Sequence, residues 1–209
     1  MEIQDVIDYL LQHDLDYPGP HQYQQKTKTF SPKKQLLIIW KFFCNQIKEH
    51  MQSNDYLTVI DVPSFGSFSF MPYNDISIKN NNTFMSTITN INNINKQKPI
   101  FQLDKIYEKI IKNYLNEKSN NISTLYPGYI PKKQTYIKWN PYPIAKICKV
   151  KPNFVSDAIK AITKAIYDLV VEGFSLIIDM NFVLISFQNG TVNYLYDTDL
   201  LFNERKNDN

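Results

Sequence analysis

The residues that could carry catalysis are few, and their spacing matches no known type of active site. Two pairs of aspartates flank polar stretches, where exposure to solvent is the ordinary environment of a carboxylate: Asp14 with Asp16, and Asp197 with Asp199. The chain has 5 glycines, too few for a glycine-rich phosphate loop. Three histidines have neither metal-ligand spacing nor a carboxylate or cysteine partner pattern: His13, His21 and His50. We therefore expect no enzymatic activity, and no catalytic, metal-binding or cofactor-binding residue.

The two cysteines, Cys44 and Cys148, lie within apolar helical patterns. Buried free thiols are their expected state, with a disulfide between them as the alternative. The acidic N-terminal residues lack the basic and apolar regions of a signal peptide. The longest apolar stretches fall short of the roughly 20 residues of a membrane span. These features predict a soluble, intracellular protein that needs no cofactor, small-molecule substrate or membrane.

Binding through aromatic and basic side chains is a second kind of chemistry, and it is concentrated in residues 126–143. Tyrosines, one tryptophan and lysines alternate with prolines there, a composition suited to docking on another protein, including an acidic one such as tubulin. The alternative is that these aromatics only hold two halves of the chain together, and the composition does not separate the two interpretations. The candidate partner-binding residues are Tyr126, Tyr129, Lys132, Lys133 and Trp139.

The elements that would position these residues begin with two helices. Apolar residues at helical spacing predict helices over residues 2–12 and 31–51. An apolar strand over 56–62 follows, and then a tight turn at Pro63 and Gly66. The return strand alternates Phe with Ser, the period-two pattern of a half-buried hairpin.

The middle of the chain is less regular. We expect a third strand at 76–78 and an uncharged, Asn-rich loop over 80–97. Order returns with a short strand over 98–103, which leads into a helix over about 104–115.

The second half repeats the pattern of the first. Helices are predicted over 141–150 and 152–172, and Gly173 is the expected stop of the second one. An Asn-Gly pair at 189–190 between two alternating runs is a strong hairpin signal. The three predicted strands cover residues 174–178, 182–187 and 191–196.

Both halves therefore have the order helix, helix, three strands. The sequence predicts an α+β fold made of two tandem copies of one small unit. We expect a first domain over 1–125, with the Asn-rich insert and a trailing helix, and a second domain over 126–209. Each half is near the size at which an isolated core becomes marginal.

The helix ending near Met51 and the turn Val62-Pro63-Ser64-Phe65-Gly66-Ser67-Phe68 resemble the bacterial histone-like HU/IHF fold. With the segment Lys98-Pro99-Ile100-Phe101-Gln102-Leu103 and the helix-plus-hairpins unit over 153–196, the chain resembles the coiled-coil-domain-containing protein eighty-one family, whose members carry tandem HU-type domains. The second copy departs from the pattern, with Asp179-Met180-Asn181-Phe182 in place of the Phe-Gly turn.

The resemblance implies an intramolecular pseudo-dimer. Bacterial HU is an intertwined homodimer, and two covalently joined copies could supply both halves of one shared core. The helices over 31–51 and 152–172 would then pack against each other.

Two functions follow from the resemblance. A DNA-binding role would need basic β-ribbon arms, yet residues 71–79 contain one lysine and one acid, and the second copy has only a two-residue turn. The net charge of +3 is also small for a nucleic-acid binder. We therefore expect a non-enzymatic scaffold, with HU-like DNA binding as the alternative. The family is linked with centrosomes and cilia, which implies cytoskeletal partners in an axoneme, centriole or basal body.

Overall fold

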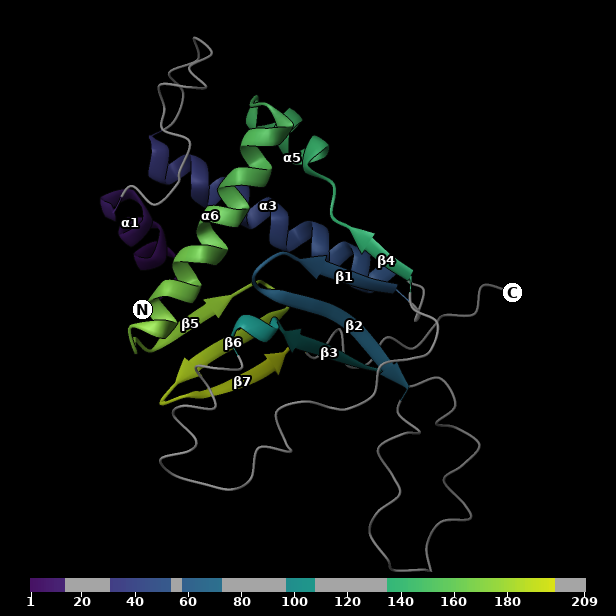
Figure 1. Cartoon of the computed structure of the whole chain (residues 1–209). Coiled ribbons are helices and arrows are strands. Elements are labelled where there is room, and N and C mark those ends of the chain that lie inside the picture. Colours follow the sequence, from purple (N-terminus) through teal and green to yellow (C-terminus); the bar gives the residue numbers. More distant parts are fainter. Residues whose placement is uncertain (14–30, 54–57, 73–96, 108–134, 198–209) are drawn as a thin grey trace, which may run out of the picture.

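The computed structural model describes residues 1–13, 31–53, 58–72, 97–107 and 135–197 (Figure 1). Within them the fold is α+β, as predicted, and the order helix, helix, three strands occurs twice. The elements of the first unit are α1 (Ile3–His13), α3 (Pro32–Ser53), β1 (Thr58–Val62), β2 (Gly66–Pro72), β3 (Gln97–Leu103) and the short 3-10 helix η2 (Lys105–Tyr107). The remaining elements are β4 (Thr135–Lys138), α5 (Pro141–Cys148), α6 (Pro152–Val171), β5 (Leu176–Asp179), β6 (Val183–Gln188) and β7 (Thr191–Tyr196).

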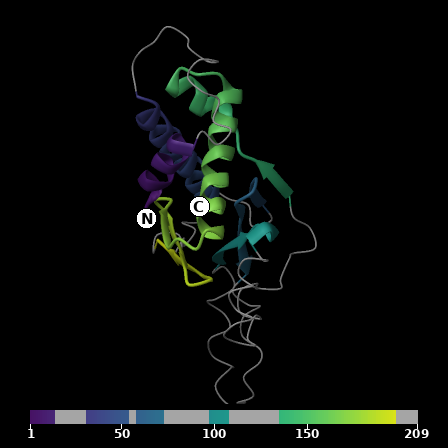
Figure 2. The same ribbon diagram turned by 60° about the vertical axis from the view of Figure 1, so that its left-hand side comes forward.

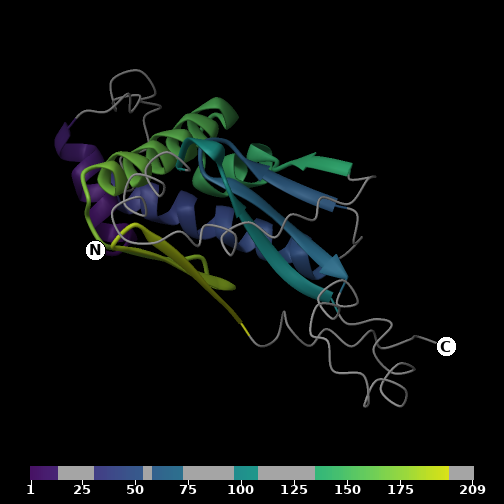
Figure 3. The ribbon, with the colours of Figure 1, turned by 60° about the horizontal axis from the view of Figure 1, so that its bottom comes forward.

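The strands form two separate sheets. The first has the order β3-β2-β1-β4, and the second has the order β5-β6-β7. All neighbouring strands are antiparallel except β4, which pairs in parallel with β1. Viewed from below, Figure 3 shows α3 running across behind both sheets. The two sheets thus lie on one side of the helices.

The predicted turn between β1 and β2 is present and is shaped by Gly66. Its φ of +154° is a conformation that residues with a side chain rarely adopt. A Cβ atom at this position would lie 2.5 Å from the carbonyl oxygen of Gln102. Phe65 in the turn and Phe68 in β2 are completely buried. The glycine therefore lets β2 and β3 approach closely above an aromatic core.

The third strand of the first sheet is β3, which corresponds to the strand predicted over 98–103. The strand expected at 76–78 and the Asn-rich loop over 80–97 lie outside the described residues, apart from Gln97, which begins β3. Of the helix predicted over 104–115, the described part is one 3-10 turn. There the Asp104 side chain accepts a hydrogen bond from the backbone N–H of Ile106, which favours a tight turn at this point.

The two units share one hydrophobic core. It includes residues of both units, from Val6 in α1 to Val192 in β7. The helix α1 packs against α6, and α5 packs against both α6 and α3. The helices α3 and α6 are also in contact, as the resemblance implied. In Figure 2 the lower end of α6 reaches the yellow strands of the second sheet, in agreement with its contact with β5.

The strand β4 crosses between the units. It belongs to the second unit by its place in the chain, within residues 126–209, yet it forms the edge of the first sheet. The boundary expected after residue 125 lies outside the described residues, and residues from both sides of it contribute to one core.

Each long helix also holds a turn of the opposite unit. In α6, the hydroxyl of Thr163 donates a hydrogen bond to the carbonyl oxygen of Pro63 in the first turn, at 3.3 Å. In α3, the Asn45 side chain accepts a hydrogen bond from Asn181 in the corresponding turn of the second unit, at 3.1 Å. Lys48 of α3 lies 3.4 Å from the carbonyl oxygen of Asn181. These reciprocal contacts make the chain an intramolecular pseudo-dimer.

Candidate interaction surface

Trp139 is the one candidate partner-binding residue that lies within the described part of the chain. It follows β4, is partly buried, and packs against the core. Its ring meets Phe43 of α3 edge to face, with 5.1 Å between ring centroids. This contact joins the two units. The alternative interpretation of the segment, that its aromatic residues hold the two halves of the chain together, describes such a contact. The other four candidates lie outside the described residues: Tyr126, Tyr129, Lys132 and Lys133.

Two aromatic side chains close to Trp139 are exposed instead. Tyr136 in β4 has 65% of its surface accessible, and Tyr142 in the first turn of α5 has 69%. The order of elements explains both positions. Tyr136 alternates with the partly buried Ile137 along the edge strand, while Asn140 caps α5 by accepting a hydrogen bond from the backbone N–H of Tyr142. Exposed tyrosines on rigid elements are typical of protein-binding surfaces.

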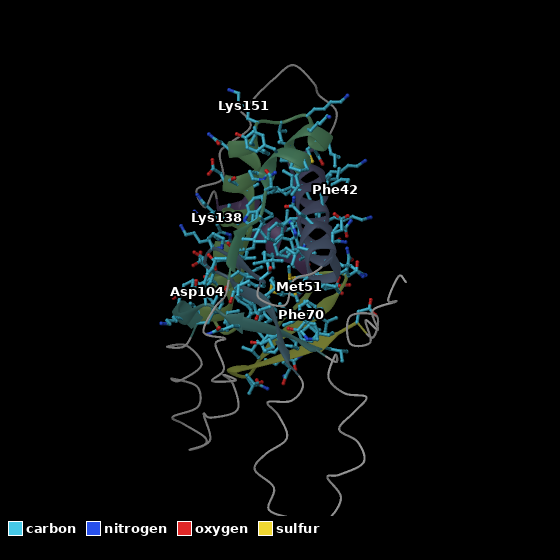
Figure 4. All side chains as sticks on the ribbon, turned by 90° about the vertical axis from the view of Figure 1, so that its right-hand side faces the viewer. Phe42, Met51, Phe70, Asp104, Lys138 and Lys151 are labelled. Atoms are coloured by element: carbon cyan, nitrogen blue, oxygen red, sulfur yellow. The ribbon has the colours of Figure 1, made fainter. Side chains whose placement is uncertain are left out.

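Lysines follow Tyr142 in α5 and in the cap residues after it. Lys146 is four residues after Tyr142, so the two side chains lie on one face of the helix, and Lys149 follows as the C-cap of α5 in a left-handed conformation with a φ of 55°. Lys151, at the N-cap of α6, continues this positive charge, and all three lysines are exposed. We call Tyr142, Lys146, Lys149 and Lys151 the α5 stripe. Figure 4 places Lys151 at one end of the molecule, with Met51 and Phe70 toward the other.

The opposite side of α5 faces the core. Ile144 and Ala145 are buried and Cys148 is partly buried, so the orientation of the short helix is set by packing. Burial raises the pKa of the Cys148 thiol, and burial raises the pKa of the Cys44 thiol well above its usual value. Both cysteines are free, as predicted, although Cys148 is only partly buried. Neither thiol has the lowered pKa of an activated nucleophile.

A charged pair lies at the end of β4, directly before Trp139. Asp61 of β1 is the register partner of Lys138 in β4. Loss of hydration raises the pKa of the Asp61 carboxyl, and the negative charge of Asp104 raises it further, while Lys138 acts in the opposite direction. Lys138 thus lies beside an acidic residue, Asp61, unlike the lysines of the α5 stripe. Its charge is partly compensated within the protein.

Two connections, β2–β3 and β6–β7, correspond to the DNA-binding arms of HU, and they differ in length. The strands β6 and β7 are joined by the two residues Asn189 and Gly190, whose φ angles of 50° and 70° give the tight turn that the sequence predicted. No ribbon arm extends from this hairpin. The β2–β3 connection, residues 73–96, lies outside the described part of the chain.

The described residues contain no group of three or more His, Cys, Asp or Glu side chains arranged to hold a metal ion. None of the helices in this part of the chain is long and apolar enough to span a membrane.

The α5 stripe was not singled out from the sequence, although a signal for it exists. Tyr142, Lys146 and Lys149 have helical spacing, and no Asp or Glu occurs between residues 135 and 156. The segment expected to bind a partner, residues 126–143, included Tyr142 but not the lysines after it, and its pattern of residue types does not say which side chains become buried.

Comparison with known families agrees with the fold. Residues 18–114 match the family model described as CCDC81 eukaryotic HU domain 1. This match covers most of the first unit, including the Phe-Gly turn. No curated protein matches the chain.

Proposed function

The chain belongs, through residues 18–114, to the CCDC81 family of eukaryotic HU-domain proteins, and from this membership we propose that it is a non-enzymatic scaffold of a microtubule-based organelle. It would act in a ciliary axoneme, doublet microtubule, centriole or basal body, through contacts with other proteins there. Its location would then be the cytoplasmic cytoskeleton, including the cilium or centrosome.

One observation supports a scaffold most directly. The protein presents Tyr136 and Tyr142 on rigid elements that are anchored in a shared core, each with about two thirds of its surface exposed. Large aromatic side chains exposed in this way contribute strongly to binding when a partner covers them. They are held by the edge of a sheet and by a capped helix, so little conformational entropy is lost on docking.

The alternative is an architectural DNA-binding protein of the HU type. It is favoured by the family fold, because HU proteins bend DNA with paired β-ribbon arms. The two-residue turn between β6 and β7 argues against it, because one of the two arms is missing. A duplex held from one side only would make fewer phosphate contacts and would bind more weakly.

The test is localisation of a tagged full-length chain, followed by extraction of the cells with detergent and then with high salt. The proposed function predicts retention in the demembranated cilium or centriole after high salt. Release into the soluble fraction by detergent alone would overturn it. A nuclear signal that moderate salt releases would instead favour the DNA-binding alternative, which a duplex-binding titration at several salt concentrations would then check.

A further inference from the structure

The α5 stripe has a geometry that suits an extended ligand. Tyr142 and Lys146 lie on one face of the helix, and Lys149 follows at its C-cap. At 1.5 Å per residue Tyr142 and Lys146 are roughly 6 Å apart along the helix axis, the length of about two residues of an extended peptide, and Lys149 extends the surface past the end of the helix. Lys151 lies just beyond, at the N-cap of α6, and adds a further positive charge to this surface. The stripe therefore matches a short linear segment rather than a broad surface.

The charge of this surface is not compensated by the described protein. None of the described residues forms an ion pair or side-chain hydrogen bond with the amino groups of Lys146, Lys149 or Lys151. The first turn of α6 contains no acidic residue, and its N-cap Lys151 makes no side-chain capping bond. The positive end of this 20-residue helix adds to the potential of the lysines. An acidic ligand would meet attraction along the whole stripe.

From this arrangement we propose that the α5 stripe binds an acidic, extended peptide segment of a partner protein. Its carboxylates pair with Lys146, Lys149 and Lys151, and its backbone or an apolar side chain covers the ring of Tyr142. The inference rests on the proposed scaffold function, because it names the chemical class of partner that such a scaffold would engage.

A peptide fits this surface better than a DNA duplex does. Affinity for a duplex comes from many phosphate contacts made at once, about six to ten in a typical site. The α5 stripe offers three lysines, one in the last turn of α5 and two at the adjoining caps, and Tyr142 provides a flat apolar contact beside them. Aromatic rings combined with a few charges are typical of peptide and protein recognition.

The experiment measures binding of a fluorescein-labelled peptide of about ten glutamates to the full chain, by fluorescence anisotropy at low salt. The site variant is Lys146→Glu, because Lys146 is exposed and makes no described contact whose loss would affect folding. The matched control is Lys105→Glu, an exposed lysine in η2 directly after Asp104, which Figure 4 shows far from Lys151. Melting temperatures of both variants check that the fold is retained.

We expect Lys146→Glu to weaken peptide binding about tenfold, since it removes an attraction and adds a repulsion, and Lys105→Glu to change it less than about twofold. The conservative variant Lys146→Arg should bind as the wild type does, and Tyr142→Ala should weaken binding without altering its salt dependence. Equal losses in the site and control variants would overturn the inference, because they would indicate attraction to net charge alone.

Two further outcomes keep the inference separate from the proposed function. Failure of the wild-type chain to bind the peptide, with retention in the cilium or centriole, would reject the acidic-peptide site and leave the scaffold function standing. Displacement of the peptide by duplex DNA at lower concentration than by unlabelled peptide would also reject the site, and would favour the DNA-binding alternative.

Discussion

The ring of Phe68 in β2 packs against the ring of Phe182, which lies just before β6, with 5.4 Å between centroids and 63° between ring planes. The two residues are 114 positions apart and belong to different units of the chain. Both are almost completely buried, so the contact lies inside the shared core. A second aromatic pair, Phe101 with Tyr194, joins β3 to β7 at a centroid distance of 5.4 Å. The two sheets are therefore linked by aromatic packing and not by backbone hydrogen bonds.

This packing predicts that the two units unfold together. Phe182→Ala should reduce the free energy of unfolding by about 3–5 kcal/mol, because it leaves a cavity between the units. The double variant with Phe68→Ala should show a coupling energy of about 0.5–1.5 kcal/mol. Urea unfolding followed by circular dichroism and by tryptophan fluorescence measures both quantities.

The control is Phe174→Ala, the same change at a position with 47% of its surface exposed, which should cost less than about 1 kcal/mol. Trp40 and Trp139 lie in different units and provide the fluorescence signal. Different unfolding transitions by circular dichroism and by tryptophan fluorescence would contradict a single cooperative core.

Gly66→Ala should destabilise the protein by more than about 2 kcal/mol. The new Cβ would lie 2.5 Å from the carbonyl oxygen of Gln102 and 2.6 Å from a ring atom of Phe101. The oxygen belongs to the β3 backbone, so relief would require disruption of the β2–β3 ladder. The control is Gly173→Ala, where φ is 87° at an exposed helix end and the expected cost is about 1 kcal/mol. Equal melting temperatures for the two variants would contradict the close approach at Gly66.

A pair of variants at Asn181 separates backbone strain from the contact with Asn45. Asn181 has a φ of 66°, and its side chain donates to Asn45 of the opposite unit. Asn181→Gly keeps the backbone conformation and removes only this exposed hydrogen bond, so it should cost about 0.5 kcal/mol or less. Asn181→Ala adds strain and should cost about 1 kcal/mol more. Thermal unfolding distinguishes them, and a larger loss for the glycine variant would refute the assignment.

The carboxyl of Asp61 makes stability depend on pH. Its pKa is raised above the usual 3.8, first by loss of hydration and then by Asp104, so the folded protein binds this proton more tightly than the unfolded chain does. Proton binding by this carboxyl therefore favours folding below the usual pKa of 3.8, and this contribution is lost as the pH rises through the raised pKa.

We therefore expect Asp61→Asn to raise the melting temperature at about pH 7 and to leave it unchanged at about pH 3. The increase should be modest, because the side chain is partly solvated. Asp157→Asn removes the same charge elsewhere and serves as the control. A variant that is less stable than the wild type at neutral pH would show that the ionised carboxylate is favourable in the fold.

Local patterns in the chain were sufficient for most of the elements. Helical spacing of apolar residues located α3 and α6, and period-two alternation located the hairpins, because both patterns reflect the geometry of consecutive residues. The turns at Gly66 and at Asn189-Gly190 followed from the few residues that tolerate a positive φ. The family resemblance rested on these same local segments, and the match over residues 18–114 confirmed it.

The tertiary structure alone decided how distant segments combine. The parallel pairing of β4 with β1 joins segments more than seventy residues apart, and no pattern within a four-residue strand specifies its partner. Packing against Phe43 turned Trp139 inward, whereas Tyr142 remained exposed beside Lys146. The physical reason is that burial depends on which surfaces meet across the pseudo-dimer. That choice depends on the complementarity of whole faces, while the types and order of residues determine only which faces are available.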